Sequence, residues 1–462
     1  METALVGSRR AQLARSRVRK LIRRGASSHL LRLLGKVRPQ DVPILLDGLT
    51  DAEQVSVFEV VLSGYPESAG DVLTAMERSN RRRLLEAMSV GQIADVLEHM
   101  AVDDAAMLVD LLPEETRGEV LRRVDVEQRA VVQTHLEYED DSAGRIMTPE
   151  FFSLPQKTTV SEAIAAIQGA RDVEMIFYLY VVDEEERLVG VASLRQLLLT
   201  APTRRLEEFM TRSAIKVTTT TDQEEVAELA AHYDLLAIPV ADEDERLVGI
   251  VTFDDIIDVF QEEATEDLMK MAGTSDDELQ YQERSWKVAR IRLPWILVNG
   301  LGLLLSGYLL RYFQVSLKEA LFLLSFVPVI MGIGGNIGGQ TSTVAVRGLA
   351  TGQLSEGEGR FAQFLFQQLK VGALMGLVCA VLAAAGALLI ESSLPFAIVV
   401  GGSLFLVVMV ASFNGAAAPV LFDRLGIDPA VAASPLVTTT SDLTGILIYF
   451  GLALSMIDLL VR

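Results

Sequence analysis

Five long apolar segments in the last third of the chain constrain its fold more than any other feature. They cover residues 293–310, 320–346, 371–390, 396–422 and 435–460. A helix needs about 20 apolar residues to cross the hydrocarbon core of a bilayer, and each segment has about that length. Several such segments in series, with few charges, are rare in soluble proteins. The sequence therefore predicts a transmembrane domain of five helices.

The charged residues that flank these segments predict their orientation. Lys and Arg are enriched on the cytoplasmic side of membrane proteins. If the first span starts inside, seven Lys and Arg residues flank the inner ends and three flank the outer ends. No apolar core of a signal peptide precedes Asp41, which favours a cytoplasmic N-terminal part. We expect a multi-pass protein of the inner or plasma membrane, with its N-terminus and soluble domains in the cytoplasm and its C-terminus outside.

The rest of the chain is strongly and unevenly charged. Residues 41–285 hold 20 basic and 53 acidic residues, a net charge of −33, in a chain whose total is −21. This negative charge argues against nucleic acid as a partner. Residues 1–40 hold 11 basic residues and 1 acidic residue. Two interpretations of this basic arm are open: an amphipathic helix held near anionic lipid, or a solvated tail.

One acidic residue, Asp442, lies inside the fifth apolar segment. It is the only charged residue between Asp428 and Asp458. An ionisable side chain within a span is costly, and it usually faces a partner, a cavity or an ion path. Alternatively, residues 440–442 cap a helix that starts directly after them. The two interpretations are compatible, because capped helix breaks inside membranes often line ion sites.

The second apolar segment contains the glycine-rich sequence GIGGNIGGQTST at residues 332–343. Glycines on a helix surface let neighbouring backbones approach closely, or allow the helix to break and turn its carbonyls toward a cavity. Tight helix packing and pore lining are therefore both open interpretations. No Lys follows the glycines, so the segment lacks the mark of a phosphate-binding loop.

The acidic part contains an internal repeat with a period of about 60 residues. The sequence EERLVG at residues 185–190 recurs as DERLVG at residues 244–249, and Met147–Thr148 recurs as Met210–Thr211. In both copies strand-like stretches alternate with an amphipathic helix, which predicts two small α/β domains. The pair resembles tandem CBS domains, which are regulatory modules that bind nucleotides or ions.

This resemblance implies candidate nucleotide contacts. Thr252 and Asp255 of the second copy match positions that in CBS domains often contact an adenosyl ribose. The first copy has Ser193 and Gln196 at these positions, so the resemblance implies at most a one-sided site for ATP or another adenine nucleotide.

Residues 39–139 have a different pattern. Their apolar residues recur every three to four positions, and Thr50 with Glu53 and Ser89 with Gln92 fit helix-starting capping boxes. The pattern predicts a stack of short helices.

A dense acidic segment links the repeat to the membrane. Residues 254–284 hold eleven acidic residues, opposed by Lys270 and Arg284. Many recur at helical i, i+3 and i+4 spacing, where like charges destabilise a helix by about 0.2–0.5 kcal/mol per pair. Either this is a solvated acidic face, or divalent cations neutralise it. Hard oxygen ligands without His or Cys suit Mg²⁺ or Ca²⁺. Cation binding would then draw the acidic domains together and pull on the first transmembrane helix.

With GGNIGGQ, GIDPA and SPLVTTTSDLTG, this order of segments resembles the MgtE family of magnesium channels. The resemblance implies a multi-domain membrane protein with an all-α helical-repeat N-terminal domain, α/β tandem CBS domains, a connecting helix and five transmembrane helices. It implies a homodimer in the lipid bilayer with a pore on the two-fold axis, for which Mg²⁺ is both permeant ion and regulator. The expected boundaries are 1–38 for the basic arm, 39–139 for the helical domain, 140–205 and 206–262 for the CBS domains, 263–286 for the connecting helix and 287–462 for the pore domain.

The resemblance also implies roles for individual residues. In the pore it implies Asp442 as the carboxylate that faces hydrated Mg²⁺, the carbonyl of Thr438 as a pore-lining group, and Asp428 as a mouth residue that shares an ion with the connecting helix. Asn336 and Ser434 are further pore-lining candidates, although Ser434 and Gly339 stand where the family often has asparagines, and Gly91 stands where it has an acidic residue. The regulatory cation ligands implied in the remaining domains are Asp95, Asp222, Glu224, Asp234, Asp255, Asp258, Glu263, Glu266 and Asp267.

The predicted function is therefore passive Mg²⁺ uptake that high intracellular Mg²⁺ closes. Two rivals are a CBS-regulated transporter of another divalent cation, such as Co²⁺ or Mn²⁺, and a membrane-anchored nucleotide sensor. We expect no enzyme activity, because the sequence offers no constellation of nucleophile and base.

Overall fold

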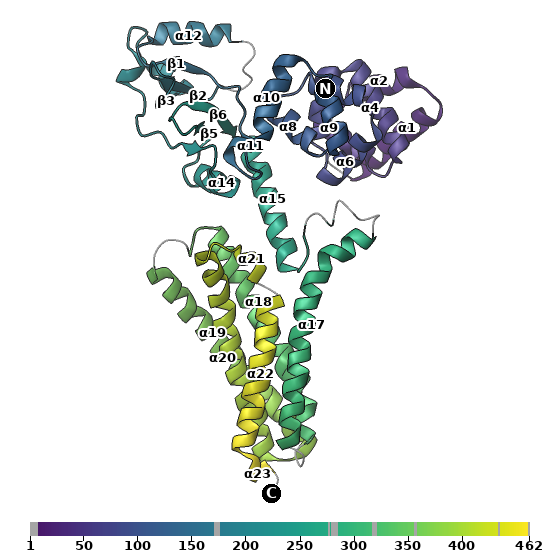
Figure 1. Ribbon diagram of the computed structural model, residues 1–462, viewed down its shortest axis with the longest axis vertical. Coiled ribbons are helices and arrows are strands. Elements are labelled where there is room, and N and C mark those ends of the chain that lie inside the picture. The colour runs from purple at the N-terminus through teal and green to yellow at the C-terminus, as the bar shows by residue number, and fades with distance from the viewer. Residues whose placement is uncertain are drawn as a thin grey trace. The chain divides into compact units, whose positions relative to one another are not determined.

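The computed structural model describes residues 8–170, 176–275, 278, 285–316, 321–354, 358–432 and 435–460. Two compact units divide the chain, an N-terminal unit of residues 1–262 and a C-terminal unit of residues 263–462. Figure 1 shows the elements of both units, and each unit is described separately.

The N-terminal unit begins with a stack of short helices, as the sequence predicts. The helices are α1 (Ser8–Arg23), α2 (Ser27–Leu34), α3 (Val42–Leu46), α4 (Asp51–Gly64), α5 (Ala69–Thr74), α6 (Arg78–Ala87), α7 (Val90–Leu97), α8 (Val102–Asp110), α9 (Glu114–Leu121) and α10 (Val126–Leu136). Both predicted capping boxes are present, at the start of α4 and at the start of α7. The helices share one apolar core, which includes Phe58 and Leu97.

The basic arm is part of this core rather than a solvated tail. Its helix α1 buries Val18 completely against the other helices. Arg15 donates to the carbonyl of Ile44 over 2.6 Å and pairs with Asp47 at 2.6 Å. Arg19 donates to the carbonyl of Gly48. The basic arm therefore forms a helix whose apolar face covers protein, and its association with anionic lipid stays a prediction.

The repeat forms two three-stranded sheets of the same topology. The first copy contains α11 (Ala143–Ile146), β1 (Ser153–Pro155), α12 (Val160–Gly169), β2 (Tyr178–Val182), β3 (Leu188–Ser193) and α13 (Leu194–Leu199). The second contains β4 (Val217–Thr218), α14 (Gln223–His232), β5 (Ala237–Ala241), β6 (Leu247–Thr252) and the start of α15 (Phe253–Met271). In each sheet the first strand pairs parallel with the middle strand, and the third pairs antiparallel with it.

The first residues of each copy pair with the third strand of the other copy. Thr148 of the first copy pairs with Ile250 in β6, and Thr211 of the second copy pairs with Val191 in β3. The glycine of each LVG sequence makes this possible. A methyl group at Gly249 would lie 3.0 Å from the carbonyl oxygen of Thr148, too close for any other residue to fit without a shift.

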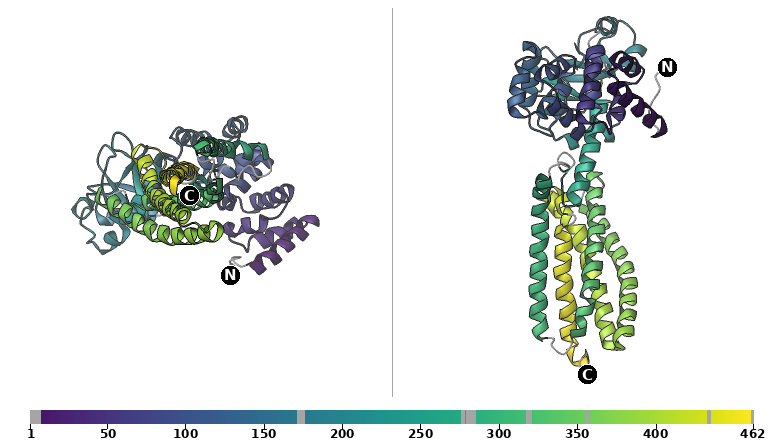
Figure 2. Two further views of the ribbon diagram at one scale, coloured as in Figure 1. Left: turned by 90° about the horizontal axis from the view of Figure 1, so that it is seen from below. Right: turned by 90° about the vertical axis from the view of Figure 1, so that its right-hand side faces the viewer.

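The C-terminal unit is a helical bundle with five helices long and apolar enough to span a membrane among the residues described. Their bounds are α17 (Ser285–Ser316), α18 (Val327–Ala350), α19 (Glu358–Glu391), α20 (Leu394–Arg424) and α22 (Pro435–Ser455). The short helices α21 (Pro429–Ala432) and α23 (Ile457–Leu460) lie before and after α22. The spanning helices run side by side (Figure 2), and α20 packs against α18, α19 and α22.

The acidic helix differs from its expected bounds. We expected a connecting helix over residues 263–286, but α15 already starts at Phe253 and ends at Met271. Gly273 follows with a φ of +75°, which ends the helix in a left-handed turn. The acidic residues Asp276, Asp277 and Glu283 lie outside the described residues.

Candidate functional site

The carboxylate of Asp442 lies in the middle of a continuous helix, α22. The prediction that residues 440–442 cap a new helix is wrong, because α22 runs without a break from Pro435 to Ser455. Asp442 is 8% exposed. An ionisable group this far from the helix ends receives no help from free backbone N–H groups. The charge of Asp442 therefore has to be stabilised by something other than a helix end.

Glycines of α18 make room for this carboxylate. The helix is unbroken over Val327–Ala350, so its glycines serve close packing rather than a helix break. A methyl group at Gly335 would lie 3.1 Å from Thr438 Cγ2 and 3.7 Å from Asp442 Oδ1. A methyl group at Gly338 would lie 2.9 Å from Ser441 Oγ. The backbones of α18 and α22 thus approach each other beside Asp442 because these positions carry no side chain.

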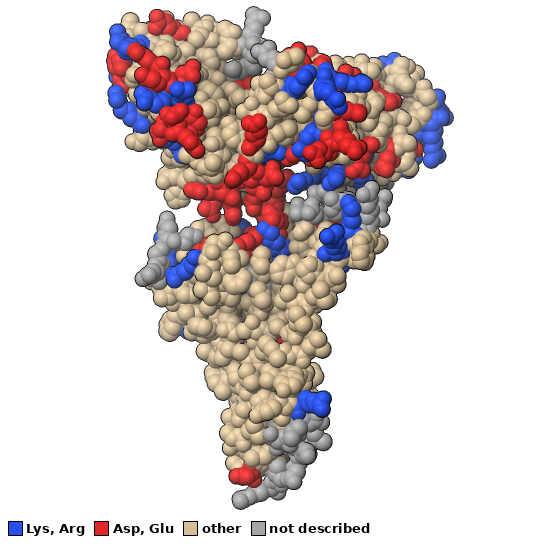
Figure 3. Space-filling model, in the orientation of Figure 1, with Lys and Arg blue, Asp and Glu red and all other residues tan. Residues whose placement is uncertain are grey.

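The other pore candidates differ in exposure. Thr438 is half-buried and Asn336 is exposed. Ser434 lies outside the described residues. Thr439, which the sequence did not single out, donates to Asn299 Oδ1 in α17 over 3.4 Å. Figure 3 shows little red or blue on the visible side of this bundle, in contrast to the N-terminal unit.

A second group of charges lies where α15 ends. Asp428 Oδ1 accepts from the backbone N–H of Ala430 over 2.7 Å, which caps α21. Asp428 Oδ2 accepts from Lys270 Nζ over 2.6 Å, and Lys270 also pairs with Glu266. Burial raises the pKa of Asp267, as does the charge of Asp428. Asp428 thus contacts the end of α15 through Lys270, and an ion shared between Asp428 and the connecting helix stays a prediction.

A third group of charges lies at the start of α15, beside the helical domain. Burial, together with the charge of Asp103 in α8, raises the pKa of Asp255 to about 8. Burial and the charge of Asp103 likewise raise the pKa of Asp104 to about 7. The charges of Glu262 and Asp258 act on Arg81, which donates to the carbonyls of Thr74 and Met76 over 2.6 and 2.9 Å.

The sequence singled out only part of this acidic group. It pointed to Asp255 and Asp258, of which Asp255 is half-buried and Asp258 exposed. It missed Asp103, Asp104 and Arg81, which come from the helical domain. The available signal was the pair of adjacent carboxylates in the first turn of α8.

Three of the remaining candidate ligands lie at the ends of α14. Asp222 caps α14 by accepting from the backbone N–H of Glu224 over 2.8 Å, and Asp234 follows that helix with a φ of +52°. Both are exposed, as is Glu224, whereas Glu263 is half-buried.

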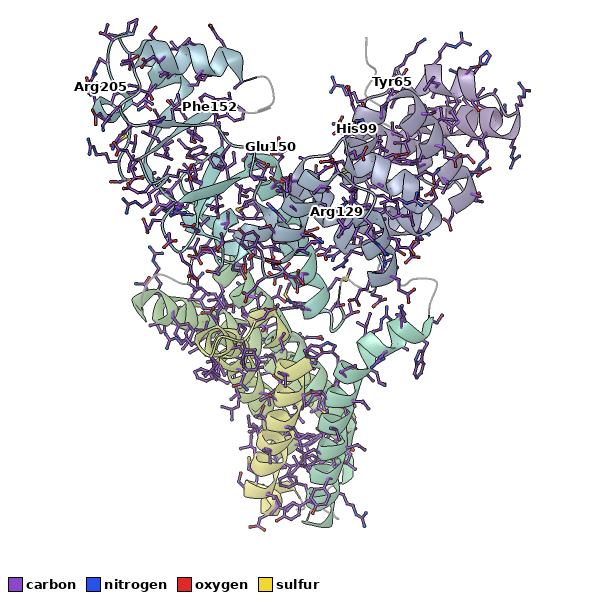
Figure 4. The ribbon with its side chains drawn as sticks, turned by 45° about the horizontal axis from the view of Figure 1, so that its top comes forward. Tyr65, His99, Arg129, Glu150, Phe152 and Arg205 are labelled. Atoms are coloured by element: carbon purple, nitrogen blue, oxygen red, sulfur yellow. The ribbon has the colours of Figure 1, made fainter. Side chains whose placement is uncertain are left out.

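Asp95 lies on the helical domain, where an open cleft of about 400 Å³ is lined by Glu59, Glu98 and His99 as well. Figure 4 labels His99 on this domain.

The predicted nucleotide contacts Thr252 and Asp255 are hydrogen-bonded to each other. Thr252 Oγ1 donates to Asp254 Oδ1 over 2.6 Å and to Asp255 Oδ2 over 2.5 Å. In the first copy, Ser193 and Gln196 form a capping box at the start of α13. The crevice beside Thr252 and Tyr180 has a volume of about 10 Å³, which suits about one water molecule. An adenine ring would need this crevice to open, and nucleotide binding stays a prediction.

No three His, Cys, Asp or Glu side chains converge on a common point within the described part of the chain as they would around one ion. The carboxylates are nevertheless of the type that Mg²⁺ prefers, and Mg²⁺ commonly keeps several waters and uses only one or two carboxylates. The donor set therefore fits hydrated Mg²⁺ better than it fits a fully coordinated metal.

Three family models match the chain. A divalent cation transporter model named MgtE matches residues 327–452, the MgtE intracellular N domain matches residues 37–141, and the CBS domain matches residues 143–201 and 206–262. These matches agree with the helical domain, the two sheets and the helical bundle described above.

Curated relatives match almost the whole chain. The magnesium transporter MgtE of Thermus thermophilus is 36% identical over 94% of this chain and 96% of its own length. The magnesium transporter MgtE of Bacillus subtilis is 32% identical over 95% and 96%. Among solved structures, the cytosolic domain of the Mg²⁺ channel MgtE in complex with ATP is 35% identical, covers 52% of this chain and 98% of that one, and has a TM-score of 0.49.

Proposed function

Because the chain belongs to the MgtE family of magnesium transporters, we propose that it is a channel through which Mg²⁺ passively enters the cell. We further propose that intracellular Mg²⁺ closes it, and that two copies of the chain form the pore in the inner or plasma membrane, with the N-terminal unit in the cytoplasm. The single observation that carries this proposal is Asp442, a carboxylate buried within a membrane-spanning helix.

The surroundings of Asp442 suit a hydrated divalent ion. An isolated carboxylate within a membrane is retained only where it has a function. Two such groups, one from each copy, would offset the charge of one Mg²⁺. Because Mg²⁺ sheds its water reluctantly, the carboxylates would hold it through its hydration shell. Gly335 places no side chain beside this carboxylate, and a methyl group there would lie 3.7 Å from Asp442 Oδ1.

No energy source is needed for uptake. An interior potential of about −100 mV lowers the energy of a divalent ion by about 4.6 kcal/mol across the full field. The chain also lacks the GxxxxGK[ST] sequence of nucleotide-driven pumps. The membrane potential therefore suffices to drive Mg²⁺ inward.

Closure would follow from the carboxylates of α15. At low Mg²⁺ the acidic groups repel one another, and bound cations remove that repulsion. A cation shifts a conformational equilibrium only if it binds one state more tightly. Several weak sites acting together can supply the roughly 5.5 kcal/mol that a nearly complete switch needs.

Mg²⁺ flux into liposomes tests the pore. Asp442→Asn should reduce uptake by at least about 100-fold, because it removes the charge that offsets the ion. Asp458→Asn is a matched control, since Asp458 is exposed on α23 and its loss should leave uptake unchanged. Thermal unfolding and size-exclusion chromatography of both variants would show that they fold. Uptake by a folded Asp442→Asn variant at the wild-type rate would refute the proposal.

The same liposomes test closure and selectivity. Raising Mg²⁺ on the cytoplasmic face should decrease uptake, and flux that does not depend on that concentration would refute the gating proposal. Replacing Mg²⁺ by Co²⁺ or Mn²⁺ distinguishes a Mg²⁺ channel from a transporter of another divalent cation.

A further inference from the structure

Both carboxylate oxygens of Asp428 already have partners. Oδ1 accepts from the backbone N–H of Ala430 over 2.7 Å, which fixes the start of α21. Oδ2 accepts from Lys270 Nζ over 2.6 Å. The second contact joins residues 158 positions apart. Asp428 is therefore held by a cation of the chain itself at the place where the family resemblance expects a shared metal ion.

The position of Lys270 is well defined by its neighbours. It lies in the last turn of α15, one turn after its second partner Glu266. The next residue, Met271, packs against Val346 and Ala430. The side chain of Lys270 is 28% exposed, so solvent screens its charge only in part. Burial alone would lower the pKa of Lys270, but the hydrogen bonds that it donates to Asp428 and Glu266 raise that pKa overall, so the ammonium stays charged at physiological pH.

We propose that Lys270 is a built-in competitor of regulatory Mg²⁺ for Asp428. The ion must displace the Lys270 ammonium from Asp428 before it can join Asp428 to α15. This inference rests on the proposed function, and it adds a residue that sets the Mg²⁺ concentration at which the channel closes. Lys270 acts as a positioning residue for Asp428 in the absence of the ion.

The charges around Asp428 explain the competition. Glu266, Asp267 and Asp428 contribute three negative charges, and Lys270 and Arg347 contribute two positive charges. An ammonium and a Mg²⁺ ion that share one carboxylate repel each other at short range. Without Lys270 the same carboxylates would carry more net negative charge, and they would bind a divalent cation more tightly.

The test compares two substitutions of Lys270 in the full-length protein. Lys270→Gln removes the charge and keeps a hydrogen-bond donor of similar reach, whereas Lys270→Arg keeps the charge. We expect Lys270→Gln to lower the Mg²⁺ concentration for half-maximal closure about tenfold. Lys270→Arg should keep the Mg²⁺ concentration for half-maximal closure within about twofold of the wild-type value, because the competing charge is still present.

A second readout does not depend on flux. The chain has 2 tryptophans, and Trp295 lies beside the turn after α15, with its Cβ 3.6 Å from the position that a methyl group on Gly273 would take. With Trp286→Phe in the background, the emission of Trp295 reports on this turn as Mg²⁺ is added. Its midpoint should shift in the same direction and by the same factor as the flux midpoint.

A double substitution isolates the contact with Asp428. In the background of Asp428→Asn, Lys270→Gln should cause a much smaller shift than it does alone, because the carboxylate for which the two cations compete directly is gone. An unchanged or higher Mg²⁺ midpoint for Lys270→Gln alone, with a Mg²⁺-responsive wild type, would overturn this inference and leave the proposed gating intact. A wild type that does not respond to Mg²⁺ in either readout would refute both.

Discussion

The two ends of α15 carry carboxylates in similar density but meet different partners. At its start, Asp255 lies near Asp103 and Asp104 of the helical domain, and burial raises the pKa of Asp255 and Asp104 to about 8 and about 7. At its end, Glu266 pairs with Lys270, which also donates to Asp428 over 2.6 Å. One end has excess negative charge, and the other has its own cation.

A cation that acts on the first group, Arg81, is used differently. Arg81 lies in α6 and is 9% exposed, but its guanidinium donates to the carbonyls of Thr74 and Met76. It acts on Asp104 and Glu262 through space. Lys270, by contrast, donates directly to a carboxylate. We infer that the start of α15 depends more strongly on protons or added cations than its end does.

The largest expected effect comes from removing Arg81. Arg81→Met leaves the carbonyls of Thr74 and Met76 without a donor and removes a positive charge from the acidic group. We expect the free energy of unfolding of the N-terminal unit to fall by about 2–4 kcal/mol without divalent cations. Chemical denaturation of the full chain in detergent, followed by hydrogen exchange of α6 and α8, measures this loss.

Arg83→Met provides the matched control, because Arg83 lies in the same helix but is exposed. Its loss should change the free energy of unfolding by less than about 0.5 kcal/mol. Addition of Mg²⁺ should restore part of the stability of Arg81→Met. Equal stabilities for the two variants would show that Arg81 does not stabilise the acidic group.

The second prediction concerns pH. The carboxyls of Asp104 and Asp255 have a pKa of about 7 and about 8 in the folded chain, against 3.8 as their ordinary value. Between those values the folded state binds more protons than the unfolded state, so stability falls as pH rises. Without divalent cations we expect the free energy of unfolding to drop by about 1–3 kcal/mol from pH 5.5 to pH 8, since the groups titrate together.

Two controls separate this effect from other titrations. Asp104→Asn should flatten the dependence on pH, because the substituted group no longer loses a proton. Saturating Mg²⁺ should flatten it as well, by stabilising the charged carboxylates. A free energy of unfolding that rises from pH 5.5 to pH 8 in the wild type would have the wrong sign for buried carboxyls and would contradict the proposed charge imbalance.

Local patterns in the sequence predicted most of the architecture. The five apolar segments predicted five spanning helices, and the repeated LVG sequence predicted two α/β copies, because both signals reflect short-range periodicity. Thr50 and Glu53 correctly predicted a helix start, since a capping box is a contact between residues three apart.

These local patterns could not predict contacts between residues that are far apart in the sequence. The exchange of Thr148 and Thr211 between the two copies is a tertiary pairing, although Gly190 and Gly249 carry the steric reason for it. The proposed cap at residues 440–442 was wrong because packing against α18 keeps α22 helical through polar residues. Asp104 meets Asp255 only in the folded N-terminal unit, so no spacing in the sequence reveals it.

The smallest expected effect comes from Glu266, at the end of α15. Glu266→Gln removes one of the two carboxylates that pair with Lys270 and leaves the other, that of Asp428. The side chain of Glu266 is 38% exposed. Solvent screens such a pair, so the free energy of unfolding should fall by only about 0.3–0.5 kcal/mol without Mg²⁺. Thermal unfolding followed by Trp295 emission measures it, with Glu263→Gln, earlier on α15, as a comparison. A decrease in the free energy of unfolding above about 1.5 kcal/mol would mean that Glu266, rather than Asp428, is the main partner that holds Lys270. The contrast between the two ends of α15 would then no longer hold.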